Sequence, residues 1–208
     1  MLDIVTVSHP LAQRELSILR DRETSSPVFR AALDRLTRIL LIEATRDLPT
    51  TEREVETPLE TTTAIEPRGS IWLCPVLRAG TGMLAPALDM IPEARVATIG
   101  LYRDEDSLEP QQYYLNLPPE PDTPEVAFVL DPMLATGGTA AATVQLLSKR
   151  ARRIELITVM CAPEGIEKLE SACPGIRVTT AAVDRQLNDK GYILPGLGDA
   201  GDRIFNTL

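Results

Sequence analysis

Five short apolar runs, rich in β-branched residues, constrain the fold of this chain more than any other feature. They cover residues 71–77, 95–102, 126–131, 154–160 and 177–184. Segments compatible with helices separate most of them, at residues 82–91, 139–151 and 163–172. Strands that are apolar on both faces and alternate with helices are typical of a mainly parallel sheet with helices on both sides. We therefore expect an α/β fold.

The N-terminal third has a different pattern. Residues 9–20 and 26–49 read as helices, with Ser26 before Pro27 as a cap and first-turn pair. Residues 50–70 are rich in Thr, Glu and Pro, which favours an edge strand or an extended connection over another helix. A charged, proline-rich segment at residues 102–125 is too long for a tight turn. We predict a protruding arm around residues 104–118 that is mobile or contacts a partner.

Size and charge set the outer limits. The 208 residues suit one domain, residues 1–208, and the 44% apolar and 25% charged content is ordinary for a globular protein. The formal net charge of −9 disfavours nonspecific nucleic-acid binding, which depends on Lys and Arg.

No apolar run reaches the ~20 residues that cross a bilayer, and the first residues do not read as a secretory signal, so we expect a cytoplasmic protein with no membrane partner. The three cysteines lack zinc-ligand spacing, which favours reduced packing residues.

The first loop that draws attention is PVLRAGTGMLA, because ligands of open parallel sheets bind beyond the carboxyl ends of the strands. Gly80, Gly82 and Ala85 have the G-x-G-x-x-G/A spacing of a dinucleotide site. Asp104 follows about twenty residues later, as in that motif. The same glycines also suit a tight turn into a packed helix, so both interpretations stay open.

The second loop, LDPMLATGGT, lacks the spacing and the lysine of a Walker A motif. Its small residues, Ala135, Thr136, Gly137 and Gly138, allow backbone N–H groups to converge at the start of a helix, which suits a monophosphate. We take the missing side chain of Gly137 to allow close approach of the phosphate. Asp131 is placed to accept hydrogen bonds from the hydroxyls of an attached sugar. An ordinary glycine-rich turn is the alternative.

A family resemblance enters at these residues. VLDPMLATGGTAAA resembles the phosphoribosyl pyrophosphate loop of type I phosphoribosyltransferases, in the Asp-Pro form of the uracil phosphoribosyltransferase family. RAGTGM, GLYRDE and GYILPGLGDAGDR resemble further blocks of that family in the same order. The resemblance implies a type I phosphoribosyltransferase fold over nearly the whole chain. It also implies transfer of ribose 5-phosphate from phosphoribosyl pyrophosphate to N1 of uracil, with Mg²⁺ on the pyrophosphate.

The resemblance also implies roles for individual residues. Arg78 and Arg103 match the family's pyrophosphate contacts and, with Asp131, form the expected catalytic set; their guanidinium groups suit phosphate oxygens. The loop expected to hold the sugar and its 5′-phosphate comprises Asp131, Pro132, Met133, Leu134, Ala135, Thr136, Gly137, Gly138 and Thr139.

The nucleobase is expected at the glycine-rich C-terminal segment. By resemblance, uracil contacts Ile193, Gly198, Asp199 and Ala200, and Asp199 also lies near phosphoribosyl pyrophosphate or its metal. Tyr192 either covers the uracil ring or packs in the core. The one histidine, His9, is a candidate base for uracil, but its surroundings favour a packing or capping role.

Two other functions remain open from the sequence. One is a regulatory pyrimidine protein that keeps this fold and binds RNA, which the net charge of −9 disfavours. The other is an NAD-binding oxidoreductase built on the GTGMLA loop. For the enzyme, the resemblance suggests a homo-oligomer, a dimer or tetramer, and raises GTP as an activator.

Overall fold

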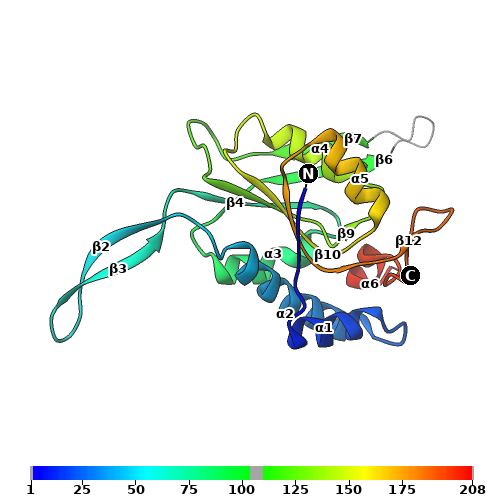
Figure 1. Cartoon of the computed structure of the whole chain (residues 1–208), viewed down its shortest axis with the longest axis horizontal. Helices are drawn as coiled ribbons and strands as arrows, with labels where there is room; N and C mark the ends of the chain where they lie inside the picture. Colours follow the sequence, from blue (N-terminus) through cyan, green and yellow to red (C-terminus); the bar gives the residue numbers. More distant parts are fainter. Residues whose placement is uncertain (1, 104–109, 208) are drawn as a thin grey trace.

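A single twisted sheet forms the centre of the molecule (Figure 1). The computed structural model describes residues 2–103 and 110–207. Along the sheet the strands follow the order β1 (Asp3–Thr6), β11 (Arg177–Val183), β10 (Ile154–Cys161), β8 (Val126–Leu130), β4 (Ile71–Leu77), β6 (Thr98–Arg103) and β7 (Pro110–Asn116). Neighbours on this path are parallel except β6 and β7. Two short strands, β5 (Arg95–Val96) and β9 (Met133–Leu134), add to β4 and β10.

Helices cover both faces of this sheet (Figure 1). One layer contains α1 (Pro10–Arg20), α2 (Ser26–Ala44), α3 (Thr81–Met90) and α6 (Ala200–Phe205), and the other contains α4 (Gly138–Leu147) and α5 (Pro163–Ala172). Successive strand residues point to opposite faces, so Leu73 packs in the α2 core and Trp72 in the α4 core. Each face has its own apolar core, which confirms the predicted α/β architecture.

The N-terminus adds a strand that the sequence did not indicate. β1 pairs in parallel with β11, with Ile4 opposite Val178. His9 then caps α1, because its Nδ1 accepts a hydrogen bond from the Leu11 N–H at 3.1 Å. The predicted capping role of His9 is confirmed. The cap position of α2 is Ser25 rather than Ser26, which is the first helical residue.

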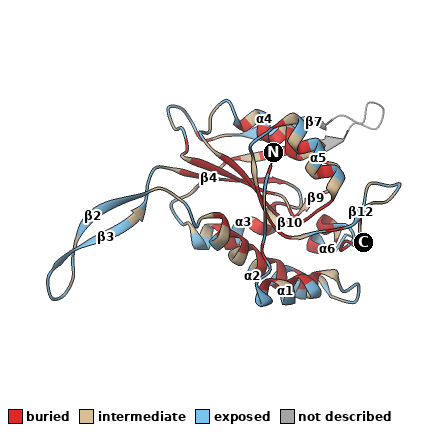
Figure 2. Ribbon diagram, in the orientation of Figure 1, coloured by how far each residue is buried: buried red, intermediate tan, exposed pale blue. Residues whose placement is uncertain are grey.

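The protruding arm of the molecule is a two-stranded hairpin (Figure 1). β2 (Thr50–Glu56) and β3 (Thr61–Pro67) pair in antiparallel fashion as a separate sheet. Almost all of its residues are exposed (Figure 2), and the side chain of Leu59 near its tip is 95% exposed. The predicted extended conformation is confirmed, but the segment pairs with itself rather than with the main sheet.

The later part of the arm predicted around residues 104–118 is an exposed edge strand of the sheet, and its contact with a partner stays a prediction. Residues 104–109 lie outside the described structure, whereas Pro110–Asn116 forms β7 at the edge of the sheet, antiparallel to β6. Tyr113 and Tyr114 favour a strand. Pro110 is the first residue of this edge strand, where the missing N–H is tolerated.

Burial agrees with a packing role for the cysteines. Cys74, Cys161 and Cys173 are free and buried. Burial raises the pKa of the Cys161 thiol to about 12, which keeps it protonated at neutral pH. Across residues 2–103 and 110–207, no helix combines the length and the apolar character needed to span a bilayer.

Candidate active site

The predicted loops meet at the carboxyl ends of the parallel strands. β4 and β8 are neighbours, with Pro75 opposite Leu130, so Arg78 and Asp131 follow adjacent strands. The first loop is packed closely against the second strand: a side chain on Gly80 would place its Cβ 2.1 Å from the Leu130 carbonyl oxygen. A glycine is therefore required at residue 80 for strand-to-loop packing.

Gly82 also has a packing role. A Cβ there would lie 3.0 Å from Ile204 Cδ1 and 3.1 Å from Leu33 Cδ2, so this glycine lets α3 approach α6 and α2. The interpretation of Gly80 and Gly82 as a tight turn into a packed helix is supported. Asp104, the acidic residue of the dinucleotide motif, lies outside the described residues.

The phosphate loop runs from Asp131 into α4. Its short strand β9 pairs with β10, and Gly137 then adopts a left-handed conformation, with φ 78°, just before α4 begins at Gly138. The first N–H groups of a helix lack intrahelical partners and form a site for an anion. A Cβ on Gly138 would have no atom within 4 Å, so this position opens onto free space.

Gly137 has a different reason to be glycine from the one predicted. A Cβ there would lie 2.6 Å from the Gly165 carbonyl oxygen and 2.9 Å from Lys168 Cβ. A Cβ on Gly165 would in turn lie 2.4 Å from the Ala135 carbonyl oxygen. The two glycines let the loop and α5 pack backbone to backbone. The close approach that Gly137 permits is therefore to α5, and Gly138 has the open side.

The other loop residues divide between the core and the surface. Pro132 and Leu134 are buried, and the Leu134 carbonyl accepts a hydrogen bond from Ala162 N–H at 2.9 Å. Thr136 and Thr139 are partly exposed at the start of α4. Pro132 and Leu134 thus anchor the loop by packing.

Asp131 has an unusual electrostatic environment. Its side chain is partly buried, and Oδ1 accepts a hydrogen bond from the Met133 N–H at 3.3 Å. Desolvation raises the pKa of this carboxyl to about 7, and the Met133 hydrogen bond opposes that shift. Asp131 can therefore change its charge near neutral pH when a ligand supplies hydrogen bonds.

The nucleobase segment is a hairpin followed by a short helix. β12 (Gln186–Leu187) and β13 (Ile193–Leu194) pair with Leu187 opposite Ile193. Asn188 closes the turn, since its Oδ1 accepts hydrogen bonds from the N–H groups of Lys190 and Tyr192. At the other end Asp199 caps α6, and its Oδ1 accepts from the Asp202 N–H at 2.9 Å.

A pocket of about 190 Å³ joins the two segments. Its lining residues come from the phosphate loop and from the nucleobase segment: Met133, Ala135, Gly191, Tyr192, Ile193, Gly198, Asp199 and Ala200. The structure therefore brings together two groups of residues that are about 60 positions apart in sequence and were predicted to share a site. A larger hollow, about 470 Å³, lies at the amino ends of β10 and β11 and contains none of the predicted site residues.

Tyr192 does not pack in the core. Its side chain is 45% exposed while it lines the pocket, which favours the alternative that it covers a ring bound there. Ile193 is buried and supports the pocket floor. Gly191 lines the pocket too, although it was not among the predicted contacts. The sequence signal for this loop was the cluster of glycines after Lys190. In the structure Gly191, Gly196 and Gly198 all have positive φ, a conformation that glycine adopts readily.

The structure describes the side chain of one of the two predicted arginines, Arg78, but not that of Arg103. Arg78 follows β4 and is not among the described residues that line the pocket. Its Nη2 lies 3.3 Å from Asp202 Oδ1, and its guanidinium lies 5.7 Å from the centre of the Phe205 ring. It is therefore beside α6, next to the nucleobase segment, with a half-exposed side chain. Arg103 ends β6, but its side chain lies outside the described structure, so its pyrophosphate contact stays a prediction.

The first turn of α5 contacts both of the segments from which the pocket lining comes. Gly165 packs against the phosphate loop as described above, and Glu164 Oε1 accepts a hydrogen bond from the Leu187 N–H of β12 at 2.9 Å. A Cβ on Gly191 would lie 3.6 Å from Thr136 Cγ2, so the two loops are also in direct reach of each other. These contacts fix the loops relative to one another. Sequence reasoning missed the role of α5, because neither residue touches the pocket.

A metal site made of protein groups alone is absent from the described residues, which contain no cluster of three His, Cys, Asp or Glu side chains able to hold an ion. Asp199 is exposed at the pocket rim and uses one oxygen to cap α6. A carboxylate has about four lone-pair positions, so this cap leaves acceptor capacity. Such a site suits Mg²⁺, which commonly binds one or two carboxylates together with substrate phosphates.

Comparison with known proteins agrees with this geometry. The family model for uracil phosphoribosyltransferase matches residues 5–207. A uracil phosphoribosyltransferase from Campylobacter fetus is 44% identical over 209 residues, covering 100% of both chains. The structure of AQ2163 protein from Aquifex aeolicus is 37% identical, covers 97% of both chains and has a TM-score of 0.91.

A hypoxanthine phosphoribosyltransferase from Staphylococcus aureus, 13% identical with a TM-score of 0.50 over 76% of both chains, is similar in fold alone. The fold is thus that of the type I phosphoribosyltransferases. The RNA-binding and oxidoreductase alternatives find no support in these matches. The chain belongs to the uracil phosphoribosyltransferase family.

Proposed function

We propose that the pocket between the phosphate loop and residues 191–200 is where this enzyme joins uracil to the ribose 5-phosphate of phosphoribosyl pyrophosphate. The pocket itself carries the proposal, because its lining comes from the two segments expected to hold the two halves of UMP. The family membership supplies the reaction. The C1–O bond to pyrophosphate breaks, the C1–N1 bond to uracil forms, and the proton of uracil N1 passes to the departing pyrophosphate or to water.

The chain's own groups serve mainly to position substrates and to stabilise charge. The start of α4 offers backbone N–H groups to the 5′-phosphate, and Asp131 accepts hydrogen bonds from the ribose hydroxyls. Arg78 and Arg103 stabilise negative charge on the departing pyrophosphate, where a guanidinium can donate two hydrogen bonds at once. Because displacement at C1 passes through an oxocarbenium-like state, orientation contributes much of the rate.

At the base end, Tyr192 covers the uracil ring. Backbone groups of Ile193, Gly198 and Ala200 match the donors and acceptors of the pyrimidine edge. Asp199 is the carboxylate that would hold Mg²⁺ together with pyrophosphate oxygens. When bound, the ion neutralises part of the pyrophosphate charge.

Formation of UMP from labelled uracil tests the proposal directly. We expect activity with phosphoribosyl pyrophosphate and Mg²⁺, and none after Mg²⁺ is chelated. Gly138→Val, which places a side chain in the open space at the start of α4, should abolish binding of phosphoribosyl pyrophosphate. Normal binding in a folded Gly138→Val protein would remove the start of α4 from the phosphate site.

The β2–β3 hairpin supports the proposal of a homo-oligomer, a dimer or tetramer. An isolated two-stranded hairpin is at best marginally stable in water, and here Leu59 and Ile65 are 95% and 61% exposed. A second copy of the chain would bury them. Light scattering of wild type and of Leu59→Asp with Ile65→Asp tests this, and an unchanged mass in the variant would rule the hairpin out as the interface.

Two further proposals concern regulation and location. GTP as an activator is tested by the rate of UMP formation with and without GTP at subsaturating phosphoribosyl pyrophosphate. A cytoplasmic location suits an enzyme with three reduced thiols and is tested by cell fractionation.

A further inference from the structure

Gly196, in the turn between β13 and α6, has both backbone polar groups bound by side chains from outside the turn. Its N–H donates to Asp184 Oδ2 at 2.9 Å, and its carbonyl accepts from Arg20 Nη1 at 2.9 Å. Its φ is 64°, and a Cβ would lie 2.1 Å from the Ile193 carbonyl oxygen. The turn therefore requires glycine at residue 196, and the side chains of Arg20 and Asp184 hold it from outside.

Arg20 and Asp184 also bind each other. Arg20 Nη2 lies 2.5 Å from Asp184 Oδ1, and Nη1 lies 2.8 Å from Oδ2, so the pair is bidentate. Although burial opposes ionisation, hydrogen bonds from Arg20 and from the Gly196 N–H lower the pKa of Asp184 below its ordinary value. The carboxylate is thus charged at neutral pH and almost fully buried. Arg20 is the last residue of α1, and Asp184 directly follows β11.

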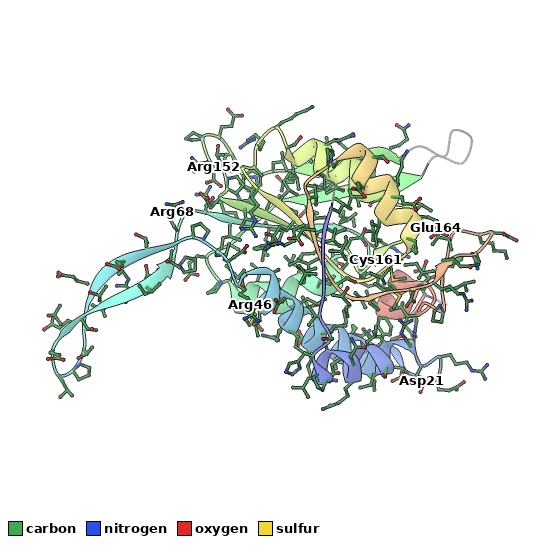
Figure 3. All side chains as sticks on the ribbon, in the orientation of Figure 1. Asp21, Arg46, Arg68, Arg152, Cys161 and Glu164 are labelled. Atoms are coloured by element: carbon green, nitrogen blue, oxygen red, sulfur yellow. The ribbon has the colours of Figure 1, made fainter. Side chains whose placement is uncertain are left out.

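Arg203 holds the next residue of the same turn. Its Nη1 donates to the carbonyls of Leu197, at 2.9 Å, and of Leu19, while Nη2 donates to the Asp21 carbonyl at 2.5 Å. Its guanidinium lies 4.5 Å from the centre of the Phe29 ring. Figure 3 labels Asp21 in the turn that follows α1. Residues 196 and 197 are therefore both tied to the end of α1.

The tied turn separates the pocket-lining residues of the nucleobase segment. Ile193 precedes it, and Gly198 and Ala200 follow it. A shift of the turn would change the spacing between these two sets of backbone groups. The phosphate loop has its own support from α5 and makes none of the contacts just described.

We infer that Arg20 and Asp184 are positioning residues for the nucleobase, and that the N-terminal helical layer thereby sets the affinity for uracil more strongly than that for phosphoribosyl pyrophosphate. The inference rests on placing uracil against residues 191–200. Arg20 touches no substrate and acts through Gly196.

The test is steady-state kinetics of Arg20→Ala with each substrate varied in turn. We expect the KM for uracil to rise about tenfold or more, as for loss of a charge-assisted hydrogen bond. The KM for phosphoribosyl pyrophosphate and kcat should stay within about threefold of wild type, well below that loss. Arg20→Lys keeps the charge but not the fork, so it should restore part of the uracil affinity.

Arg35→Ala is the matched control. Arg35 Nη2 pairs with Glu15 Oε2 at 2.7 Å, and Glu15 is as buried as Asp184, but this pair joins α1 to α2 away from the turn. Without Arg20, Asp184 keeps the Gly196 N–H, and without Arg35, Glu15 keeps a contact with Arg14 at 3.4 Å. Each buried carboxylate nevertheless loses its shortest ion pair, so both variants should have a lower melting temperature. Only Arg20→Ala should raise the KM for uracil.

Three results would overturn the inference: an unchanged KM for uracil in folded Arg20→Ala, an equal rise in both KM values, or the same rise in Arg35→Ala. If Arg20→Ala does not fold, Arg20→Lys is judged by the same criteria. The placement of uracil against residues 191–200 is tested separately. It fails if wild-type enzyme forms UMP but Tyr192→Ala leaves the KM for uracil unchanged.

Discussion

Replacing Asp131 with Asn should stabilise the ligand-free protein, and more so as the pH rises. Burial raises the pKa of Asp131 from 3.8 to about 7. Between these values the folded protein binds a proton that the unfolded chain has lost, so the free energy of unfolding falls with increasing pH. About three pKa units at ~1.4 kcal/mol each give a penalty of ~4 kcal/mol above pH 7.

Most of that penalty develops in an accessible range. Roughly 3 kcal/mol of it accrues between pH 5 and pH 8, which corresponds to roughly 5–10 °C in Tm for a chain of this length. Asn keeps an oxygen for the Met133 N–H and carries no charge. The Tm of Asp131→Asn minus that of wild type should therefore widen by this amount from pH 5 to pH 8. Glu155, whose pKa is also raised by burial, is common to both proteins and cancels.

Thermal unfolding in matched buffers measures this difference. A constant gap in Tm across the range would refute the claim that Asp131 is held in a desolvating site. Ligand binding gives a second check, since ribose hydroxyls that donate to the carboxylate favour its charged form. Wild type should release protons when it binds phosphoribosyl pyrophosphate at pH 7, and Asp131→Asn should not.

Three further substitutions separate chemistry from structure. Arg78→Ala should lower kcat by ~10²–10³-fold with Arg78→Lys recovering part, and steady-state turnover within about threefold of wild type would remove Arg78 from the catalytic set. Gly137→Ala should lower stability by ~1–3 kcal/mol in denaturant unfolding, because its Cβ meets the Gly165 carbonyl; unchanged stability would show that α5 yields easily. Tyr192→Ala should raise the KM for uracil at constant stability, since the ring is exposed, and a lowered Tm with normal KM would mark it as a packing residue.

The sheet could be predicted from the sequence because its strands are apolar on both faces. Four of the five apolar runs each became one strand, and the run at residues 95–102 became two, β5 and β6. The small-residue loop after β8 led directly to the pocket. β1 was missed, since four residues with exposed ends carry little periodic signal. β7 was misread because the prolines and charges on either side of it outweighed Tyr113 and Tyr114, although an edge strand tolerates its one proline, Pro110.

The site was predictable where a residue lines the pocket and much less so where it packs against another element. Ala135, Gly198 and Ala200 line the pocket as expected. By contrast, the reason for Gly137 is its contact with Gly165, 28 positions away, which no local pattern shows. The anchors of Gly196 come from residues at opposite ends of the chain. Such pairs depend on tertiary neighbours, and a single sequence does not reveal them.

The first turn of α5 has a consequence for how the active site could change. Glu164 holds the nucleobase hairpin and Gly165 holds the phosphate loop, and adjacent helical residues differ by a rise of only ~1.5 Å. The two segments that line the pocket are therefore anchored to α5 within one peptide unit of each other. To widen the pocket, this fold would have to lengthen or replace the contact of Glu164 with the β12–β13 hairpin. The contact of Gly165 with the loop before α4 could stay unchanged. The two halves of the pocket lining are thus anchored separately, at two consecutive positions that do not themselves line the pocket.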